Sequence, residues 1–149
     1  MRWRRAQTGR SRYGCHGLPA KRSDRLGSWL ERFGRAWETR NAEEAAALFS
    51  EDGSYRETPF DEPLTGGEEI RAHWSSLPKA RRTSAFSYEI LAQTEFWGIA
   101  RWQGAYTPAD REMQLELDGI LLLSLDHEGR CRDFREWSNR REHRPPPAT

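Results

Sequence analysis

The chain has 149 residues, a length that fits a single domain. Its net charge is only +1, but eight of the 24 basic residues and one of the 23 acidic residues fall within residues 1–26. The rest of the chain is therefore acidic, which excludes the basic stripe that nucleic-acid binding needs, and no apolar run is long enough for a membrane span.

The cysteines and histidines show no spacing that suggests a metal or disulfide site. There are two cysteines, Cys15 and Cys131, and the four histidines are scattered. We therefore expect no disulfide framework, no metal and no other cofactor. The basic N-terminus lacks the apolar segment of a secretory signal, so we predict a cytoplasmic protein.

The chain divides into one domain and two flanking segments. Residues 1–26 are rich in Arg, Gly and Ser without hydrophobic periodicity, and we predict a disordered extension. The domain is expected at residues 27–141, and residues 142–149, with three consecutive prolines, are expected to form a disordered tail. An alternative for the extension is that its basic residues dock on an acidic partner.

Three capping signatures predict three helices. Each has a capping residue followed three positions later by glutamate, namely Ser28 with Glu31, Asn41 with Glu44, and Thr65 with Glu68. Apolar residues at helical spacing follow each start, and they are Trp29, Phe33, Ala36 and Trp37 in the first helix, Ala45, Leu48 and Phe49 in the second, and Ile70, Trp74 and Leu77 in the third. Pro78 ends the third helix.

After Pro78 the hydrophobic period changes from 3.6 to 2, which predicts strands. A short strand at 54–58 precedes the third helix, and four longer strands follow at 86–92, 96–106, 113–125 and 130–138. The order ααβαββββ predicts an α+β domain. One curved antiparallel sheet should curl around the three N-terminal helices as a cone.

The turn Asp126–Gly129 sets a register for the last two strands. Counting from it pairs Leu121 with Phe134 and Gly119 with Glu136 on the inner face. Asp118 then faces outward and pairs with Arg135, unless a bulge at Gly119 turns it inward. Both orientations of Asp118 stay open.

The sequence resembles the nuclear transport factor 2-like superfamily, and within it the SnoaL-like branch, which is related to ketosteroid isomerase. The residues that carry the resemblance are the run from Asn41 to Tyr55, Pro59-Phe60, Gly66 and Ile70-Arg71, and the similarity extends over about residues 28–141. It implies a cone with a pocket for a small apolar or aromatic ligand. It also implies a homodimer, since many members associate through the outer face of the sheet.

The resemblance to ketosteroid isomerase implies a catalytic base at Glu57. The two donors that stabilise the oxyanion in that enzyme fall on Phe33 and Leu121, which are apolar. Steroid isomerisation by that scheme is therefore not expected. The epoxide-hydrolysing relatives use an Arg flanked by carboxylates, but Arg101-x-Gln103 has an amide where a carboxylate is needed.

Two functions remain open: a cofactor-free acid–base enzyme of isomerase, cyclase or lyase type, and a non-catalytic ligand-binding or dimerisation module. The catalytic candidates are Glu57 as the base, with His73, Tyr88, Glu136 and Asp118. The alternative role of Glu57 is an ion pair with Arg56 or Arg71. The candidate ligand-binding residues are Phe33, Trp37, Tyr55, Phe60, Trp74, Tyr88, Trp102, Leu121 and Phe134.

Overall fold

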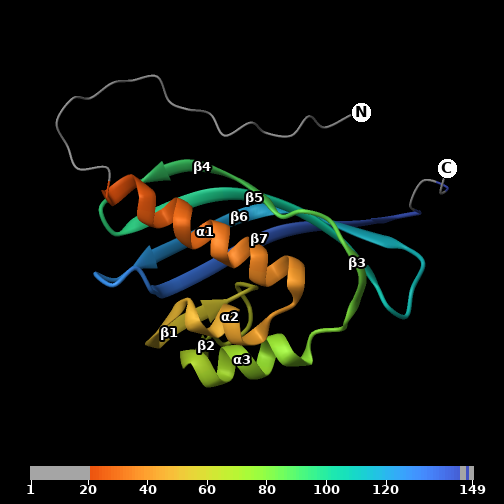
Figure 1. Cartoon of the computed structure of the whole chain (residues 1–149), viewed down its shortest axis with the longest axis horizontal. Coiled ribbons are helices and arrows are strands. Elements are labelled where there is room, and N and C mark those ends of the chain that lie inside the picture. The colour runs from red at the N-terminus through yellow and green to blue at the C-terminus, as the bar shows by residue number, and fades with distance from the viewer. Residues whose placement is uncertain (1–20, 145–146, 148–149) are drawn as a thin grey trace.

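The computed structural model describes residues 21–144 and 147, so Cys15 and most of the predicted extension lie outside the described residues. The described helices are α1 (Lys21–Thr39), α2 (Ala42–Ala47) and α3 (Gly66–Ser76). The strands are β1 (Phe49–Arg56), β2 (Leu64–Thr65), β3 (Ala80–Thr83), β4 (Ser87–Gln93), β5 (Trp97–Pro108), β6 (Gln114–Leu125) and β7 (Cys131–His143). The strands form one strongly curled sheet with α1 lying across it, which confirms the predicted α+β cone (Figure 1).

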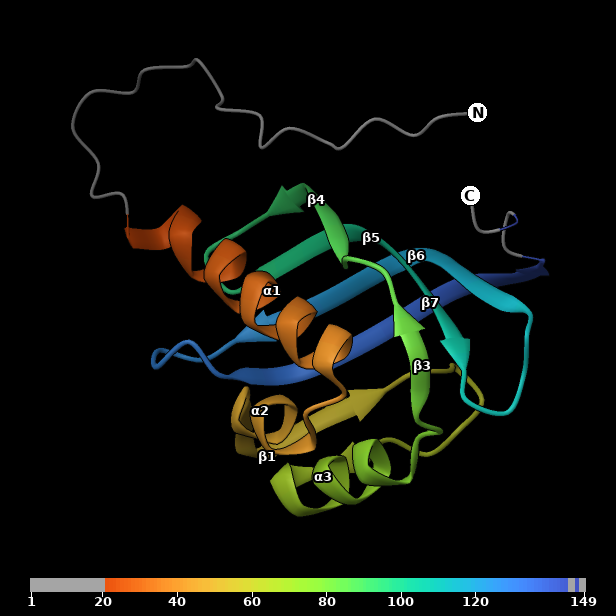
Figure 2. The ribbon, with the colours of Figure 1, turned by 45° about the vertical axis from the view of Figure 1, so that its right-hand side comes forward.

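The sheet brings the first long strand next to the last. Its order is β2-β1-β7-β6-β5-β3, and β4 also pairs with β5 (Figure 2). The pair β1–β7 is parallel and the other pairs are antiparallel. The prediction of a purely antiparallel sheet is therefore wrong at β1–β7. This parallel pair sets Tyr55 opposite Phe134, which places the end of β1 beside the first part of β7.

Some predicted strand limits are also wrong. The strand predicted at 54–58 is β1, which begins at Phe49 and ends at Arg56. The short strands β2 and β3 carry only two and four residues, too few for an alternating pattern to be recognised. Strand β7 continues to His143, so the predicted boundary at residue 141 cuts through it.

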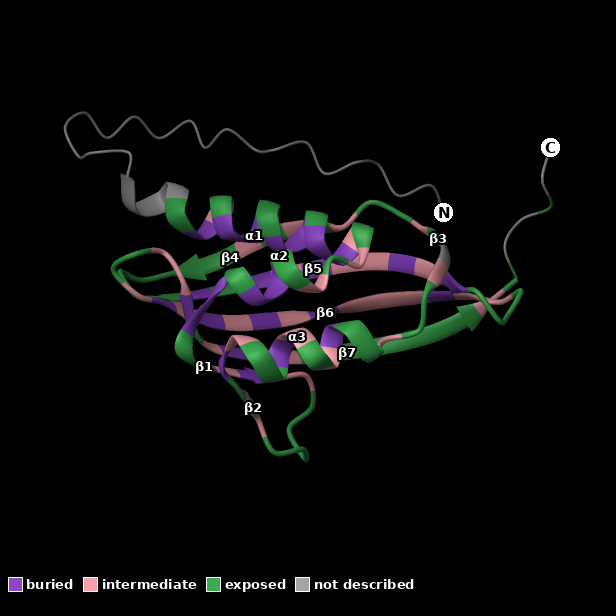
Figure 3. Ribbon diagram, turned by 60° about the horizontal axis from the view of Figure 1, so that its bottom comes forward, coloured by how far each residue is buried: buried purple, intermediate pink, exposed green. Residues whose placement is uncertain are grey.

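Helix α1 begins earlier than its capping signature predicted. Ser28 lies inside the helix, and Leu26 is 5% exposed and packs on Gly98 of β5. The predicted boundary at residue 26 therefore cuts a helix whose first turns belong to the domain. The predicted apolar stripe is correct, because its four residues are all buried on the side of α1 that faces the sheet (Figure 3).

The other two helix starts are where they were predicted. The Asn41 side chain accepts a hydrogen bond from the Glu44 backbone N–H at 3.1 Å, which confirms this cap. Thr65 precedes α3 but its hydroxyl makes no capping bond. Instead, Glu69 accepts a hydrogen bond from the Thr65 backbone N–H at 2.7 Å, so the acidic partner is Glu69 and not Glu68.

The hairpin of β6 and β7 is shifted by two residues from the predicted register. Leu121 pairs with Glu136, and Leu123 pairs with Phe134. Half of the shift arises at the turn, where Leu125 pairs with Cys131 and not with Arg130, and a bulge between Ser124 and Leu125 adds the second residue on β7. A shift of two residues keeps each side chain on its face, so Leu121, Phe134 and Glu136 lie on the inner face as predicted.

The core lies between α1 and the inner face of the sheet and is dominated by aromatic rings. Phe33 stacks on Trp29 at 5.0 Å and meets Phe134 at 5.3 Å between ring centroids. Trp37 lies over Gly104 of β5, where an added Cβ would be 2.6 Å from its ring. We call the buried rings the aromatic core, and its members are Trp29, Phe33, Trp37, Phe49, Trp102 and Phe134.

Candidate functional site

Glu57 lies one residue beyond β1 and contacts side chains from two elements. The Tyr55 hydroxyl donates a hydrogen bond to Glu57 Oε1 at 2.5 Å, and His73 Nε2 on α3 is 3.2 Å from Glu57 Oε2. The Glu57 and His73 side chains are 35% and 29% exposed. The structure thus brings the predicted pair Glu57 and His73 together, whereas Arg71, the other predicted partner, pairs with Glu43 at 2.8 Å.

The buried side chain of Tyr55 holds Glu57 in position. Its ring is 3% exposed and stacks on Phe134 at 4.8 Å, with 9° between the planes. Burial, followed by the negative charges of Glu57 and Glu136, holds the pKa of the Tyr55 hydroxyl well above its usual value. The hydroxyl therefore keeps its proton and acts as a neutral donor to Glu57.

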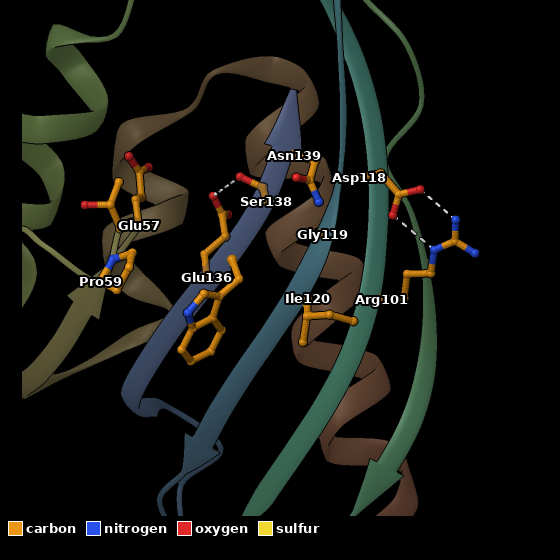
Figure 4. Close-up of a pocket in the computed structure, with 11 residues that line it drawn as sticks. Glu57, Pro59, Arg101, Asp118, Gly119, Ile120, Glu136, Ser138 and Asn139 are labelled. Atoms are coloured by element: carbon orange, nitrogen blue, oxygen red, sulfur yellow. Dashed lines mark hydrogen bonds and ion pairs between the residues drawn. The ribbon is translucent and has the colours of Figure 1, made fainter. Parts of the chain in front are cut away.

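Glu136 completes this group from the neighbouring strand β7. Its carboxylate accepts a hydrogen bond from Ser138 at 3.3 Å (Figure 4). Burial, and then the negative charge of Glu57, raises the pKa of Glu136 to about 8. This raised pKa favours the protonated form of Glu136 near neutral pH. We call Tyr55, Glu57, His73 and Glu136 the polar cluster.

A hollow of about 480 Å³ opens beside the polar cluster. It lies along β7 where β1 has ended, between the segment Glu57–Pro59 and the strands β6 and β7 (Figure 4). Glu57, Glu136 and Ser138 line it together with the apolar side chains of Ile120 and Trp137. Because it carries three carboxyl groups, those of Glu57, Glu136 and Asp118, beside apolar surface, this hollow is the candidate binding site.

Most of the predicted ligand-binding aromatics are buried in the interior instead of lining open space. Trp102, for example, is 2% exposed and stacks on Phe86 at 5.5 Å. The buried members of the predicted set are Phe33, Trp37, Tyr55, Trp74, Trp102, Leu121 and Phe134. Phe60 is different, because it is 96% exposed. Its predicted place in the wall of the pocket is wrong.

Tyr88 lies away from Glu57. Its hydroxyl donates a hydrogen bond to Glu31 on α1 at 3.0 Å. Burial, and then the hydrogen bond to Glu31, raises the pKa of Tyr88 to about 12. Of the three predicted partners for Glu57, the structure therefore assembles His73 and Glu136 with it and engages Tyr88 elsewhere.

Asp118 faces outward, because no bulge occurs at Gly119 and the register of β6 is regular there. It accepts hydrogen bonds from Arg101 Nε at 3.0 Å and from Gln103 Nε2 at 2.8 Å. The hydrogen bond from Arg101 is the main reason why the pKa of Asp118 lies below its usual value. Its predicted pairing with Arg135 is wrong, since Arg135 pairs with Asp133.

Sequence reasoning missed a set of buried donors inside the cone. Within the described part of the chain, Trp102 Nε1 and two nitrogens of Arg40, Nε and Nη2, are buried without a hydrogen-bond partner. Buried donors are usually satisfied, so such groups are unusual. Their positions depend on which side chains cover them, a property that no sequence pattern reports.

The described residues offer no metal site and no membrane span. Nowhere among them do three His, Cys, Asp or Glu side chains gather as metal ligands would. Their helices are too short or too polar to cross a bilayer.

Cys131 is fully buried, and burial raises the pKa of its thiol.

Comparison with protein-family models gives a match to the SnoaL-like domain over residues 30–134. None of the curated protein sequences matches the chain. The family match covers most of the cone and includes all of the polar cluster except Glu136.

Solved structures with the same fold include two enzymes and a binder. A Δ5-3-ketosteroid isomerase from Mycobacterium sp. aligns with a TM-score of 0.67 and 12% identity, over 80% of this chain and 98% of the isomerase. An epoxide hydrolase of the LEH-like type from Mycobacterium tuberculosis aligns with a TM-score of 0.60 and 14% identity, over 78% and 84% of the two chains. A computationally designed binder of 17-OHP aligns with a TM-score of 0.67 and 13% identity, over 80% and 98%. Likeness at such low identity shows the fold alone.

Proposed function

Because the chain belongs to the SnoaL-like domain family of the nuclear transport factor 2-like superfamily, we propose that it is a cofactor-free acid–base enzyme that acts on a small apolar substrate. The observation that carries the proposal is the pairing of two carboxyl groups in different environments. Glu57 accepts a hydrogen bond from Tyr55 and contacts His73, while Glu136 has a pKa raised to about 8. Carboxyl groups whose environments differ in this way supply a base and an acid at one pH.

In this mechanism Glu57 removes a proton from carbon or from water, and Glu136 donates one. The Tyr55 hydrogen bond and the His73 contact hold the Glu57 carboxylate in a fixed orientation. The protonated Glu136 is positioned to protonate an oxygen on the substrate as a leaving group or an enolate forms. Phe33 and Leu121 offer no donor, so the proposed reaction is an elimination, hydration or cyclisation rather than steroid isomerisation through a two-donor oxyanion hole.

The base role of Glu57 can be tested with 5-nitrobenzisoxazole, a flat apolar probe. Removal of its C3 proton breaks the N–O bond and releases a coloured nitrophenolate, so the reaction reports a base in an apolar site. We expect the protein to accelerate this elimination and Glu57→Gln to lower kcat/KM by about 100-fold or more. Glu112→Gln, in the exposed β5–β6 turn, is the matched control and should leave the rate unchanged. Equal rates for Glu57→Gln and the unaltered protein would exclude Glu57 as the base.

The second candidate function is a non-catalytic ligand-binding module. It is favoured by the aromatic core, whose rings fill the interior between α1 and the sheet. The elimination assay separates the two functions when combined with calorimetry. Binding of a flat apolar compound such as 2-naphthamide, with no acceleration of the elimination, would favour the binding module.

The proposal includes a homodimer formed through the outer face of the sheet. Two apolar side chains of β5 that are more than a third exposed lie there, and they are Trp97 and Ile99. Light scattering after size-exclusion chromatography should give the mass of two chains. Ile99→Glu should give one chain, while Arg35→Gln on the exposed side of α1 should not change the mass.

A further inference from the structure

Arg40 ends helix α1 in a conformation that arginine rarely adopts. Its φ is 55°, and it is the single non-glycine residue with positive φ in the described part of the chain. The Asn41 N–H donates to Ala36 O at 3.0 Å, and the Arg40 N–H donates to Trp37 O at 3.4 Å, as in a Schellman motif. Glycine usually takes this position, because a side chain there costs about 1 kcal/mol. An arginine retained at such a position points to a use for its side chain.

The turn directs the guanidinium between two aromatic rings. Arg40 Cζ is 4.5 Å from the centroid of Tyr106 and 5.2 Å from that of Trp37. Both rings make cation–π contacts with the guanidinium, and these contacts do not use its N–H bonds. Burial lowers the pKa of the Arg40 guanidinium, and nearby Tyr106 and Glu57 oppose this shift.

The remaining edge of the Arg40 guanidinium carries two parallel N–H bonds, one from Nε and one from Nη2, which we call the Arg40 fork. Arg40 Nε and Nη2 are both buried and have no hydrogen-bond partner among the described residues. The same two nitrogens bind a carboxylate in two other arginines of this protein. Arg101 Nε and Nη2 donate to Asp118 at 3.0 and 2.6 Å, and Arg135 Nε and Nη2 donate to Asp133 at 3.1 and 2.9 Å.

We propose that the Arg40 fork binds the carboxylate of a small ligand whose apolar part lies against the rings of Trp37 and Tyr106 beside the guanidinium. A planar carboxylate matches the fork with two charge-assisted hydrogen bonds. The bound anion would satisfy donors that are otherwise buried without partners. The inference deepens the proposed function by making the substrate an apolar carboxylic acid, but binding at Arg40 does not require that Glu57 be a base.

The test compares 2-naphthoate with 2-naphthamide, which has the same shape and no charge, by isothermal titration calorimetry. We expect the unaltered protein to bind the naphthoate about 10-fold tighter or more, the scale of a charge-assisted bidentate pair. Arg40→Gln should remove this preference, and Arg40→Lys should keep only part of it, because a lysine has charge without the fork. Arg35→Gln, on the exposed side of the same helix, should keep all of it.

A measurement on the unaltered protein avoids any effect of substitution on folding. The ¹⁵N–¹H resonance of Arg40 Nε should shift on addition of naphthoate and not on addition of naphthamide. Equal affinity for the two probes, a preference that survives Arg40→Gln, or a failure of both naphthoate and the smaller benzoate to bind would each overturn the inference. A naphthoate preference without base-catalysed elimination would refute only the proposed activity, and the reverse result would refute only the Arg40 site.

Discussion

The aromatic core and the polar cluster share the inner face of one sheet but are built differently. In the aromatic core the rings contact one another, as Phe134 does with Phe33 at 5.3 Å. In the polar cluster Glu57 is 35% exposed, and Glu136 has a pKa raised to about 8. Groups whose environment lowers stability are concentrated at the candidate site, whereas the aromatic core stabilises the fold. The following substitutions test whether the aromatic core mainly determines stability and the polar cluster mainly determines activity.

Phe134→Ala should have the largest effect on stability. Phe134 is fully buried and stacks on Tyr55, so its removal leaves a cavity at the centre of the aromatic core. We expect the free energy of unfolding in urea to fall by about 3–5 kcal/mol. Phe60→Ala is the control, because Phe60 is 96% exposed and its loss should change stability by less than about 0.5 kcal/mol. Similar losses for the two variants would contradict the assignment of the core.

Glu136→Gln should stabilise the protein, and increasingly so as the pH rises. The pKa of Glu136 is raised to about 8 in the folded state, so below the ordinary carboxyl pKa the residue is protonated in both states and has no effect. Above that value the unfolded chain loses the proton more readily, and native stability falls until the pH passes about 8. The variant lacks this penalty, so at pH 9 it should be about 2–4 kcal/mol more stable than the unaltered protein.

Urea unfolding at pH 4 and pH 9 measures this difference. Glu112→Gln, in an exposed turn, should show the same stability as the unaltered protein at both pH values. A stabilisation by Glu136→Gln that does not grow with pH would mean that Glu136 ionises normally in the folded protein.

The sequence predicted the aromatic core better than the polar cluster, and the reason is physical. Periodicity identifies the buried face of an element, so Trp29, Phe33 and Phe134 were placed on the buried face correctly, even though the hairpin register was wrong by two residues and Phe33 and Phe134 were expected to line a pocket. The family resemblance supplied Glu57. The contact of Glu57 with Tyr55 depends on where β1 meets β7, which follows from a parallel pairing that the alternating pattern does not encode.

Arg40 shows the same limit more clearly. It stands between two helices as one more charged residue, and nothing in its neighbours predicts a positive φ. The capping signatures report where helices start, but the conformation that ends α1 depends on the packing of Trp37 and Tyr106 around the arginine. The family resemblance likewise did not predict that Phe60 is exposed in its loop.

A pair of substitutions at Arg40 should reveal the backbone strain at the end of α1. Arg40→Gly and Arg40→Ala both remove the guanidinium and its contacts with Trp37 and Tyr106. Only glycine adopts a φ of 55° without a steric cost. Arg40→Gly should therefore be more stable than Arg40→Ala by about 1 kcal/mol in urea unfolding. Equal stabilities would indicate that the helix does not end in a left-handed residue in solution.

Asp118→Asn should have the smallest effect, because Asp118 lies on the opposite face of the sheet from Glu136. Its side chain is 44% exposed, and the ion pair with Arg101 is accessible to solvent, so its loss should cost less than about 1 kcal/mol. The pKa of Asp118 is lowered, chiefly by Arg101, so this contribution is present above the ordinary carboxyl pKa and disappears as the pH falls through the lowered value. The elimination of 5-nitrobenzisoxazole should proceed as in the unaltered protein. A loss of rate comparable with that of Glu57→Gln would give Asp118, which lines the same hollow, a catalytic role and would contradict the assignment of the chemistry to Glu57 and Glu136.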